Sequence, residues 1–344
     1  MPFLNTTHPQ WQKALLSNAY DIYHLPGYCS MEAKVLNGLP LAWSTQIDGI
    51  TFIIPLIERI IHSNGVIERD LLSPYGYPGI LYPFNTPQAA IFEAIKQFHN
   101  EAANADYVSS FIRLHPIYNE FRIPSIDNLS QHAHGSTVAI DLTLPVNTIH
   151  FNFSNDHKRN LKRLNKRNFT SKLNDWDRLA DFIALYNQTM QRKKAQPRYF
   201  FTPDYFNDLK NELADSLFLV TITDANNVMA AGGLFTLCNG LSQFHLSGTD
   251  QRYIKESPSR LMMVTAIEAL KKKGASTLHL GGGFGSNNTD GLFLFKAGFG
   301  QRRYRFDTLR FIHLPDKYDK LLKTSANVYQ KPGAFFPEYR FLKS

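Results

Sequence analysis

GGGFGSNNTDGLFLFKAGFG, residues 281–300, is the stretch that decides how this chain is organised. It follows an apolar run and leads into a short segment with aromatic residues at helical spacing. Three consecutive glycines carry no Cβ atoms, so a ligand or another backbone can approach them closely. The Asn-Asn-Thr-Asp sequence at 287–290 supplies residue types that cap helix N-termini. We therefore predict a buried strand that turns through an open glycine loop onto a helix.

Lys296 is the candidate catalytic residue of this stretch, because it is the only Lys or Arg between Lys273 and Arg302. A cation beside a glycine loop can stabilise the negative charge that develops on an acyl carbonyl. The alternative is an ordinary tight turn followed by a solvated lysine. The spacing matches neither G-x-G-x-x-G nor a Walker sequence, so it predicts neither dinucleotide nor P-loop binding. The candidate substrate-binding glycines beside this lysine are Gly281, Gly282 and Gly283.

Length and composition narrow the class of protein. A chain of 344 residues indicates two domains, and 43% hydrophobic residues exclude a disordered chain. The net charge of +8 favours polyanionic partners such as phosphate-bearing substrates, RNA or an anionic membrane surface. The cysteines, Cys29 and Cys238, lie far apart, which indicates a reducing compartment. No signal-peptide pattern or transmembrane run is visible, so we expect a cytoplasmic protein.

The first half of the sequence predicts strands around one helix. Leu39–Ser44 and Ile50–Arg59 are β-rich runs separated by an Asp-Gly turn, and Thr86–Ala103 has helical periodicity. Between them the sequence SPYGYPG, residues 73–79, excludes regular structure through its prolines and glycines. We expect this rigid loop to hold a substrate; the alternative is a surface turn with packed tyrosines. The candidate substrate-binding residues in this half are Tyr75, Gly76, Tyr77 and Lys34.

SNDHKRNLKRLNKRNF, residues 154–169, predicts a helix with a strongly basic face. Ser154 can cap its start, while Leu161 and Leu164 face inward. Like charges four residues apart on a helix repel each other, which indicates that these cations meet phosphates. The alternative is a solvated basic face beside a domain boundary. The candidate phosphate- or tRNA-binding cations form two stripes, Lys158, Lys162 and Lys166 beside Arg159, Arg163 and Arg167.

The second half predicts two helices, three antiparallel strands, and then alternating helices and strands. The three strands are expected at 217–223, 228–238 and 241–247, with Asn-Asn and Asn-Gly turns between them. Arg192 and Lys193 end the first helix and are candidates for binding an anionic acceptor, or else they complete the helix dipole. His245, on the third strand, is a candidate base or else a packed core histidine. The twelve histidines show no metal-ligand spacing, so no metal site is predicted.

Several segments resemble one protein family: SNDHKRNLKR, LYNQTMQRKKAQPRYFF, QFHLSGT, SPSRLMMVTAIEALKKKGASTLHLGGG and DGLFLFKAGFG. Together with the element order they resemble the Fem-type branch of the GNAT acyltransferase superfamily, whose best-known members are peptidoglycan bridge aminoacyltransferases. The similarity runs from about Leu71 to Phe311. It implies an α/β (α+β) fold with two tandem GNAT-like domains, in which mixed sheets are flanked by helices. The helical-hairpin arm of some Fem enzymes is absent here.

The resemblance also implies an activity. We expect an acyltransferase that takes an acyl or aminoacyl group from aminoacyl-tRNA or acyl-CoA, with no tightly bound cofactor. The expected acceptor is an amine of a phosphate-bearing cell-envelope or surface-polysaccharide precursor. Residues 248–259 lack the glycines of the R/Q-x-x-G-x-G/A pyrophosphate loop, which favours aminoacyl-tRNA or an unusual acyl-CoA mode.

Domain limits and alternatives complete these expectations. We expect a first GNAT-like domain over residues 1–153 with the returning tail 317–344, and a second over 154–316. The tail contains several aromatic residues, which makes it too apolar to lie free in water. The alternatives to an acyltransferase are a catalytically inactive GNAT-like binding module and a basic RNA-binding protein.

Overall fold

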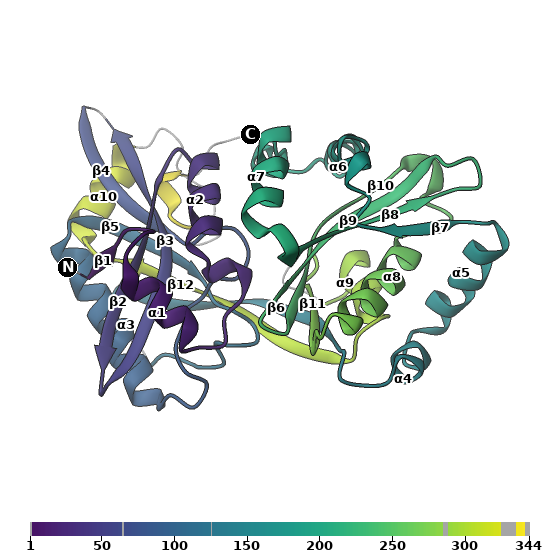
Figure 1. The fold of residues 1–344 in the computed structure, drawn as a ribbon. Coiled ribbons are helices and arrows are strands. Elements are labelled where there is room, and N and C mark those ends of the chain that lie inside the picture. Colours follow the sequence, from purple (N-terminus) through teal and green to yellow (C-terminus); the bar gives the residue numbers. More distant parts are fainter. Residues whose placement is uncertain (1, 64, 125, 285–287, 325–334, 341–344) are drawn as a thin grey trace. The chain divides into compact units, whose positions relative to one another are not determined.

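The computed structural model describes residues 2–63, 65–124, 126–284, 288–324 and 335–340. Asn287, one of the predicted helix-capping residues, lies outside these ranges. The chain forms two compact units, Met1–His134 with Arg305–Ser344, and Gly135–Tyr304. The ribbon in Figure 1 labels their helices and strands. The predicted α/β class is confirmed, because each unit combines antiparallel and parallel strand pairs with helices that cover them.

Within the described residues, the first unit has six strands in the order β1-β2-β3-β4-β5-β12. Neighbouring strands are antiparallel except β4 and β5, which run parallel. The predicted hairpin is β2 and β3, and the predicted helix is α3. The elements of this unit are β1 (Phe3–Leu4), α1 (Pro9–Leu16), α2 (Pro26–Val35), β2 (Leu39–Ile47), β3 (Ile50–Ser63), β4 (Val66–Leu72), α3 (Gln88–Asn104), β5 (Tyr107–Arg113), β12 (Arg302–Ile312) and α10 (Pro315–Thr324).

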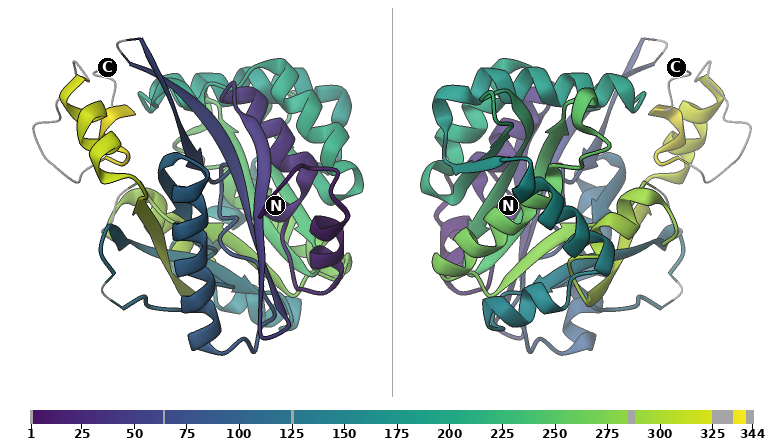
Figure 2. Two further views of the ribbon diagram at one scale, coloured as in Figure 1. Left: turned by 90° about the vertical axis from the view of Figure 1, so that its left-hand side faces the viewer. Right: turned by 90° about the vertical axis from the view of Figure 1, so that its right-hand side faces the viewer.

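Alternating residues of β3 divide the core of the first unit into two layers. Phe52 and Ile54 pack with α3, whereas Ile53 and Ile57 pack with α1 and α2. This alternation follows from the two-residue period of a strand. Figure 2 shows the blue helix α3 and the purple helices α1 and α2 on opposite sides of the strands.

The second unit repeats this strand order as β7-β8-β9-β10-β11-β6. Here β10 and β11 are the parallel pair and the other neighbours are antiparallel. The elements are β6 (Leu129–Asp141), α4 (Val146–Phe151), α5 (Asn155–Lys166), β7 (Thr170–Leu173), α6 (Leu179–Arg192), α7 (Pro203–Leu213), β8 (Leu217–Thr223), β9 (Met229–Cys238), β10 (Leu241–Thr249), α8 (Ser259–Lys272), β11 (Thr277–Gly281) and α9 (Gly291–Ala297).

Two adjacent glycines of β9 show which helices cover which face of the second sheet. A Cβ on Gly232 would meet Phe182 of α6, while a Cβ on Gly233 would meet Met262 of α8. Because neighbouring strand residues point to opposite faces, α6 and α8 lie on opposite sides. In Figure 1, α6 and α7 lie above this sheet, and α8 and α9 lie below it. Small residues in β9 therefore let both helices approach the sheet closely.

The sixth strand of each unit comes from the other half of the sequence. Residues 138–141 of β6 pair with β11, although β6 follows β5 in the chain. Residues 308–312 of β12 pair with β5, although β12 follows β11. The division between units accordingly falls at 134/135 and 304/305, rather than at the expected 153/154 and 316/317. Pairing partners, which sequence order does not reveal, cause this difference.

The C-terminal segment packs on the first unit through aromatic contacts and one buried carboxylate. Tyr318 and Tyr339 join a small cluster with Val108 of β5. The Tyr339 hydroxyl donates to Asp70 Oδ2 at 2.9 Å, and Arg340 Nε donates to the same oxygen at 2.6 Å. Asp70 is fully buried, so these bonds compensate its charge and fasten the segment.

Candidate functional site

The parallel strands of the second unit separate before they end. Their pairing covers Leu241 to Gln243 on β10, where Gln243 faces His279 of β11. Beyond that point β10 continues to Thr249, and a register shift interrupts its pairing with β9 between Phe244 and Leu246. Ligands of open α/β sheets bind at the carboxyl ends of strands, where neighbouring strands diverge. The separation of β10 from β11 is therefore where a site is expected.

The triple glycine leads from the point where β10 and β11 separate into α9. Its backbone conformation and close packing require glycine. Gly281 has a φ of +72°, a conformation that favours glycine. A Cβ on Gly283 would lie 1.8 Å from Asp290 Oδ2. Asp290 caps α9, since its Oδ1 accepts hydrogen bonds of 3.0 Å from both Leu292 N and Phe293 N. The predicted strand, glycine loop and capped helix are thus present.

Lys296 points back from α9 to the glycine loop. Its Nζ donates to Gly282 O at 2.6 Å and lies 5.9 Å from the centre of the Phe244 ring. The side chain is only 8% exposed. Burial lowers the pKa of Lys296 to about 8, while Asp290 opposes this shift. The alternative of a solvated helix lysine is therefore wrong, because this ammonium group is held inside the domain.

This arrangement has a definite chemical capacity. With a pKa of about 8, most Lys296 side chains carry the proton at pH 7. An ammonium group has three donors, and the bond to Gly282 O uses one of them. The remaining donors can stabilise an oxyanion that forms beside the loop, where low dielectric strengthens the interaction.

Two further predicted residues lie at the same end of the sheet. Arg192 Nη2 donates to Thr249 O, at the end of β10, at 3.0 Å. Lys193 Nζ lies 5.7 Å from the centre of the ring of Phe284, which directly follows the triple glycine. The structure thus brings Arg192, Lys193, the glycines and Lys296 to the same end of the strands of one sheet.

His245 lies at the register shift of β10. Burial lowers the pKa of His245 to about 4, so its imidazole is neutral at pH 7. A neutral imidazole with so low a pKa is a weak proton acceptor. Its position favours the packed-histidine alternative over the role of general base.

The predicted basic helix is α5, with Ser154 as its cap. All the predicted cations except the half-buried Lys158 are exposed, whereas Leu164 is buried. Arg167 pairs with Glu256 at 2.7 Å, and Arg163 donates to Lys255 O at 2.9 Å. These contacts join part of one stripe to the segment before α8.

The remaining cations of α5 face solvent more freely. Arg159 reaches Asp156 at 3.8 Å, and Lys158 lies 5.0 Å from the centre of the exposed Phe151 ring. Lys162 and Lys166 have no ion pair with any residue that the structure describes. A positive face thus remains available on this helix.

His157 is a structural residue that the sequence interpretation missed. It is buried on α5, and its Nε2 lies 2.8 Å from Phe295 O in α9. Arg260 Nε of α8 lies 2.8 Å from its Nδ1. The available signal was its spacing: His157 shares the inward face with Leu161 and Leu164.

The candidates in the first unit are built into its packing. Tyr28 donates its hydroxyl to Tyr75 O at 3.1 Å, and Tyr77 packs edge-on against Phe306 at a centroid distance of 5.0 Å. Gly76 has a φ of +94°, and a Cβ there would lie 2.2 Å from the Tyr23 ring. These contacts match the alternative of a turn with packed tyrosines. Lys34 is exposed near the end of α2.

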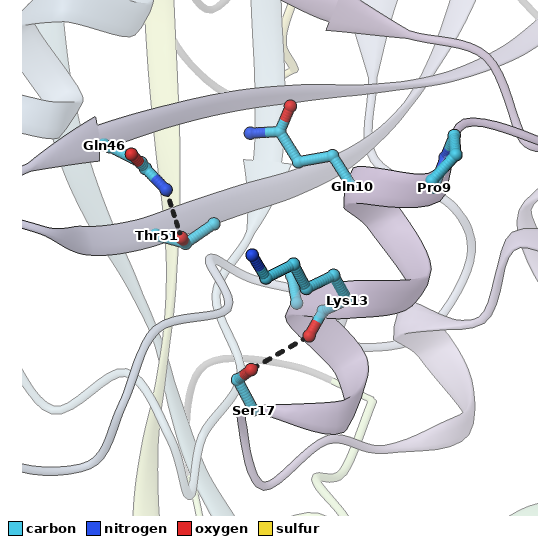
Figure 3. Close-up of a pocket in the computed structure, with 7 residues that line it drawn as sticks. Pro9, Gln10, Lys13, Ser17, Gln46 and Thr51 are labelled. Atoms are coloured by element: carbon cyan, nitrogen blue, oxygen red, sulfur yellow. Dashed lines mark hydrogen bonds between the residues drawn. The ribbon is translucent and has the colours of Figure 1, made fainter.

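A separate pocket lies in the first unit between α1 and the β2–β3 hairpin. Its volume is about 700 Å³. Figure 3 shows Lys13 and Gln10 of α1 on one side, and Gln46 bonded to Thr51 on the other. It contains none of the predicted site residues, and its polar lining carries no catalytic constellation.

Metal-ligand clusters and membrane-spanning helices are both absent from the described ranges. Within them, no three or more His, Cys, Asp or Glu side chains are grouped so that they could hold a metal ion. No helix in that part of the chain combines the length and apolar character needed to cross a bilayer.

Comparisons with known proteins agree with this geometry. Residues 152–288 match the family model described as an acetyltransferase (GNAT) domain. This match covers the basic helix, the diverging strands and the triple glycine, and it confirms the predicted acyltransferase class. A search of curated proteins finds no match.

Solved structures show the same fold across almost the whole chain. FemX has a TM-score of 0.67 at 14% identity, over 94% of this chain and 100% of its own. L-PGS from Bacillus licheniformis has a TM-score of 0.55 at 12% identity, over 91% of this chain and 95% of its own. The C-terminal domain of a putative lysylphosphatidylglycerol synthetase from Agrobacterium fabrum has 0.54 at 10% identity, over 92% and 94%. The predicted resemblance to the Fem-type branch is thus confirmed at the level of the fold.

Proposed function

We propose that the chain transfers an acyl or aminoacyl group from an activated ester or thioester to an amine, with Lys296 as the oxyanion donor. One observation carries the proposal: a buried ammonium group lies against a glycine loop where two parallel strands separate. Burial of a charged group without a carboxylate bonded to it is costly, and such groups concentrate at functional sites.

The reaction needs little covalent machinery from the protein. The acceptor amine attacks the donor carbonyl, a C–N bond forms, and the carbonyl oxygen becomes an oxyanion. Collapse of this intermediate breaks the C–O or C–S bond, and the proton lost by the amine passes to the leaving alkoxide or thiolate. Alignment of the reactants can supply about 7 to 11 kcal/mol of the barrier. A hydrogen-bond donor to the oxyanion, such as Lys296 Nζ, lowers the barrier by a few kcal/mol more.

The partners follow from charge. We propose aminoacyl-tRNA or acyl-CoA as donor, because each combines an activated carbonyl with phosphates. The exposed cations of α5, including Lys162 and Lys166, are proposed to bind phosphates of this ligand, while Arg192 and Lys193 bind an anionic acceptor. The acceptor class that fits is an amine of a phosphate-bearing cell-envelope or surface-polysaccharide precursor.

The residues before α8 bear on how a donor is held. The backbone N–H groups of Arg252, Tyr253 and Ser257 already donate within the segment, to Asp250 and Tyr253. An amide cradle for a diphosphate needs such groups unoccupied. This supports aminoacyl-tRNA, or an acyl-CoA held in another way.

Thermal unfolding with candidate donors tests this function. Charged tRNA and a panel of acyl-CoA thioesters are added separately, and each midpoint is compared with that of the free protein. A donor at 100 times its dissociation constant stabilises the folded state by about 2.7 kcal/mol. The donor that stabilises the protein is then mixed with phosphate-bearing amines, and product is followed by mass spectrometry. Stabilisation by uncharged RNA alone, without transfer, would instead support an RNA-binding protein.

A further inference from the structure

The helix that carries Lys296 is too short to hold its own position. α9 has 7 residues, and isolated helices of this length are not stable in water. Asp290 fixes its start. Near its end, His157 of α5 meets Phe295 O, the carbonyl directly before Lys296, at 2.8 Å. The position of Lys296 therefore depends on a contact with another helix.

Packing makes this contact a close fit. The His157 ring lies with its centre 4.0 Å from that of Phe299. A Cβ on Gly298 would lie 2.5 Å from His157 Nε2, so glycine is needed for the helix end to reach the imidazole. Within the sequence AGFG that follows Lys296, Gly298 and Phe299 thus pack closely against the His157 ring.

Arg260 determines which nitrogen of His157 carries the proton. A guanidinium group only donates hydrogen bonds, so Nδ1, 2.8 Å from Arg260 Nε, must be the acceptor. The proton of the neutral ring therefore lies on Nε2, which donates to Phe295 O. Asp156 forms an ion pair with Arg260 and orients it. The chain Asp156, Arg260, His157, Phe295 O connects α5, α8 and α9.

We propose that His157 is a positioning residue for Lys296: through its Nε2–H bond to Phe295 O, and with its tautomer fixed by Arg260, it holds the Lys296 ammonium against the glycine loop. The catalytic consequence rests on the proposed function, whereas the structural consequence does not. A displacement of about 1 Å at a reacting group can cost about a hundredfold in rate.

The charges around both groups define the pH response. His157 faces Arg260 of α8, the carbonyl of Phe295 in α9, and Asp156 on its own helix. Burial lowers the pKa of His157, and Arg260 lowers it further, because a protonated Nδ1 would oppose the guanidinium. Lys296 faces Asp290, Gly282 O and the Phe244 ring. On acidification Lys296 is therefore already protonated when His157 takes up a proton and the chain breaks.

Carbon-13 NMR of the full chain with labelled lysine tests this without any substrate. The Cε signal of Lys296 is identified by its loss in Lys296→Arg, and its titration is followed from pH 6 to 11. The parent is expected to titrate near 8. His157→Leu should move the midpoint toward the ordinary lysine value of about 10.4, because a loosened α9 admits water. His157→Gln, whose amide can still donate to Phe295 O, should stay near the parent.

Controls and further readouts keep the outcome clear. His150→Leu removes a different, half-buried histidine of this unit, which lies beside Phe153 and Glu268 and not α9, and should leave the midpoint unchanged. If His157→Leu does not fold, Arg260→Met releases the same tautomer and should shift the midpoint in the same direction. An unchanged midpoint in folded His157→Leu or Arg260→Met overturns the proposal.

Activity separates this proposal from the proposed function. With an active donor and acceptor, His157→Leu should lower kcat at least tenfold with KM unchanged, and His157→Gln should restore most of it. Full activity in Lys296→Met would reject the catalytic role of the lysine. The NMR titration would still decide whether His157 positions it.

Discussion

The two units end their parallel strand pairs in different ways. In the first unit, pairing of β4 with β5 reaches Leu72 and Phe111, and Ser73 N then donates to Phe111 O at 2.9 Å. Arg113 closes the junction with a bond from Nη1 to Ser73 O at 3.0 Å. In the second unit, pairing of β10 with β11 stops six residues before Thr249. Two units with one strand order thus have one closed junction and one open junction.

The difference shows how one topology separates structural from functional tasks. At the closed junction, the SPYGYPG loop continues the pairing and is fixed by packed tyrosines such as Tyr77. At the open junction, the triple glycine leads away from β10, and the buried Lys296 lies beside the point where β10 and β11 separate. The same fold hosts different roles because function lies in the site rather than in the topology.

Replacing Lys296 by methionine tests the open junction with the largest expected effect. Turnover should fall about 10² to 10³-fold, the range for removal of one oxyanion donor, while the thermal midpoint stays near that of the parent. Single-turnover kinetics with saturating donor measures it. Lys271→Met is the matched control, because it removes another lysine–carbonyl bond, to Leu142 O at 2.7 Å, at the opposite end of β11. Equal rates in the two variants would reject the catalytic role.

Obstructing the glycine loop should affect both activity and folding. A Cβ at Gly282 already lies 3.2 Å from Ser136 O, and valine adds two further methyl groups. We expect Gly282→Val to reduce activity more than tenfold and to destabilise the protein by about 1 to 3 kcal/mol, the usual range for overpacking. Urea unfolding and donor affinity are measured together.

Gly291→Ala is the control for that substitution, since no atom lies within 4 Å of its added Cβ. It should keep both stability and activity. Parent-like donor affinity in Gly282→Val would mean that ligand does not approach this loop.

The pH dependence of turnover distinguishes an ammonium donor from an amine base. The folded pKa of Lys296 is lowered to about 8, so the protonated form declines as pH rises through that value. If the ammonium group acts, kcat should fall about tenfold per pH unit above 8, and Lys296→Met should lack this limb. A limb that rises through 8 in the parent would indicate the neutral amine as base instead.

The salt dependence of donor binding tests whether the basic helix binds phosphates. Its expected effect is the smallest of these predictions. Replacing Lys158, Lys162 and Lys166 by glutamine should lower the slope of log affinity against log salt by about 0.7 to 0.9 for each phosphate that the helix no longer neutralises. Binding of the stabilising donor is titrated between about 50 and 300 mM salt. The control replaces three exposed lysines of the first unit, which are Lys13, Lys96 and Lys320. Equal slopes in both triple variants would leave α5 as solvated surface.

Several local features could be predicted from the sequence because their causes are local. Glycine conformation, helix capping and hairpin turns depend on residues a few positions apart, so the stretch 281–300 correctly predicted strand, loop and helix. The 3.6-residue period likewise predicted the outward cations and the buried Leu164 of α5. For SPYGYPG, the sequence left two alternatives open, and only the observed packing of Tyr23 and Tyr28 favours the packed turn.

The sequence by itself determined that the chain is long enough for two domains, that it mixes helices and strands, and that Lys296 lies close to its glycines. These properties follow from composition and short-range geometry. Only the tertiary structure decided that β6 and β12 exchange units, that Lys296 is buried, and that His157 holds its helix. The β6–β11 and β12–β5 pairings and the contact of His157 with Phe295 O join residues more than a hundred positions apart. The spacing of residues in the sequence does not indicate which distant backbone or side-chain atoms will bury a given group.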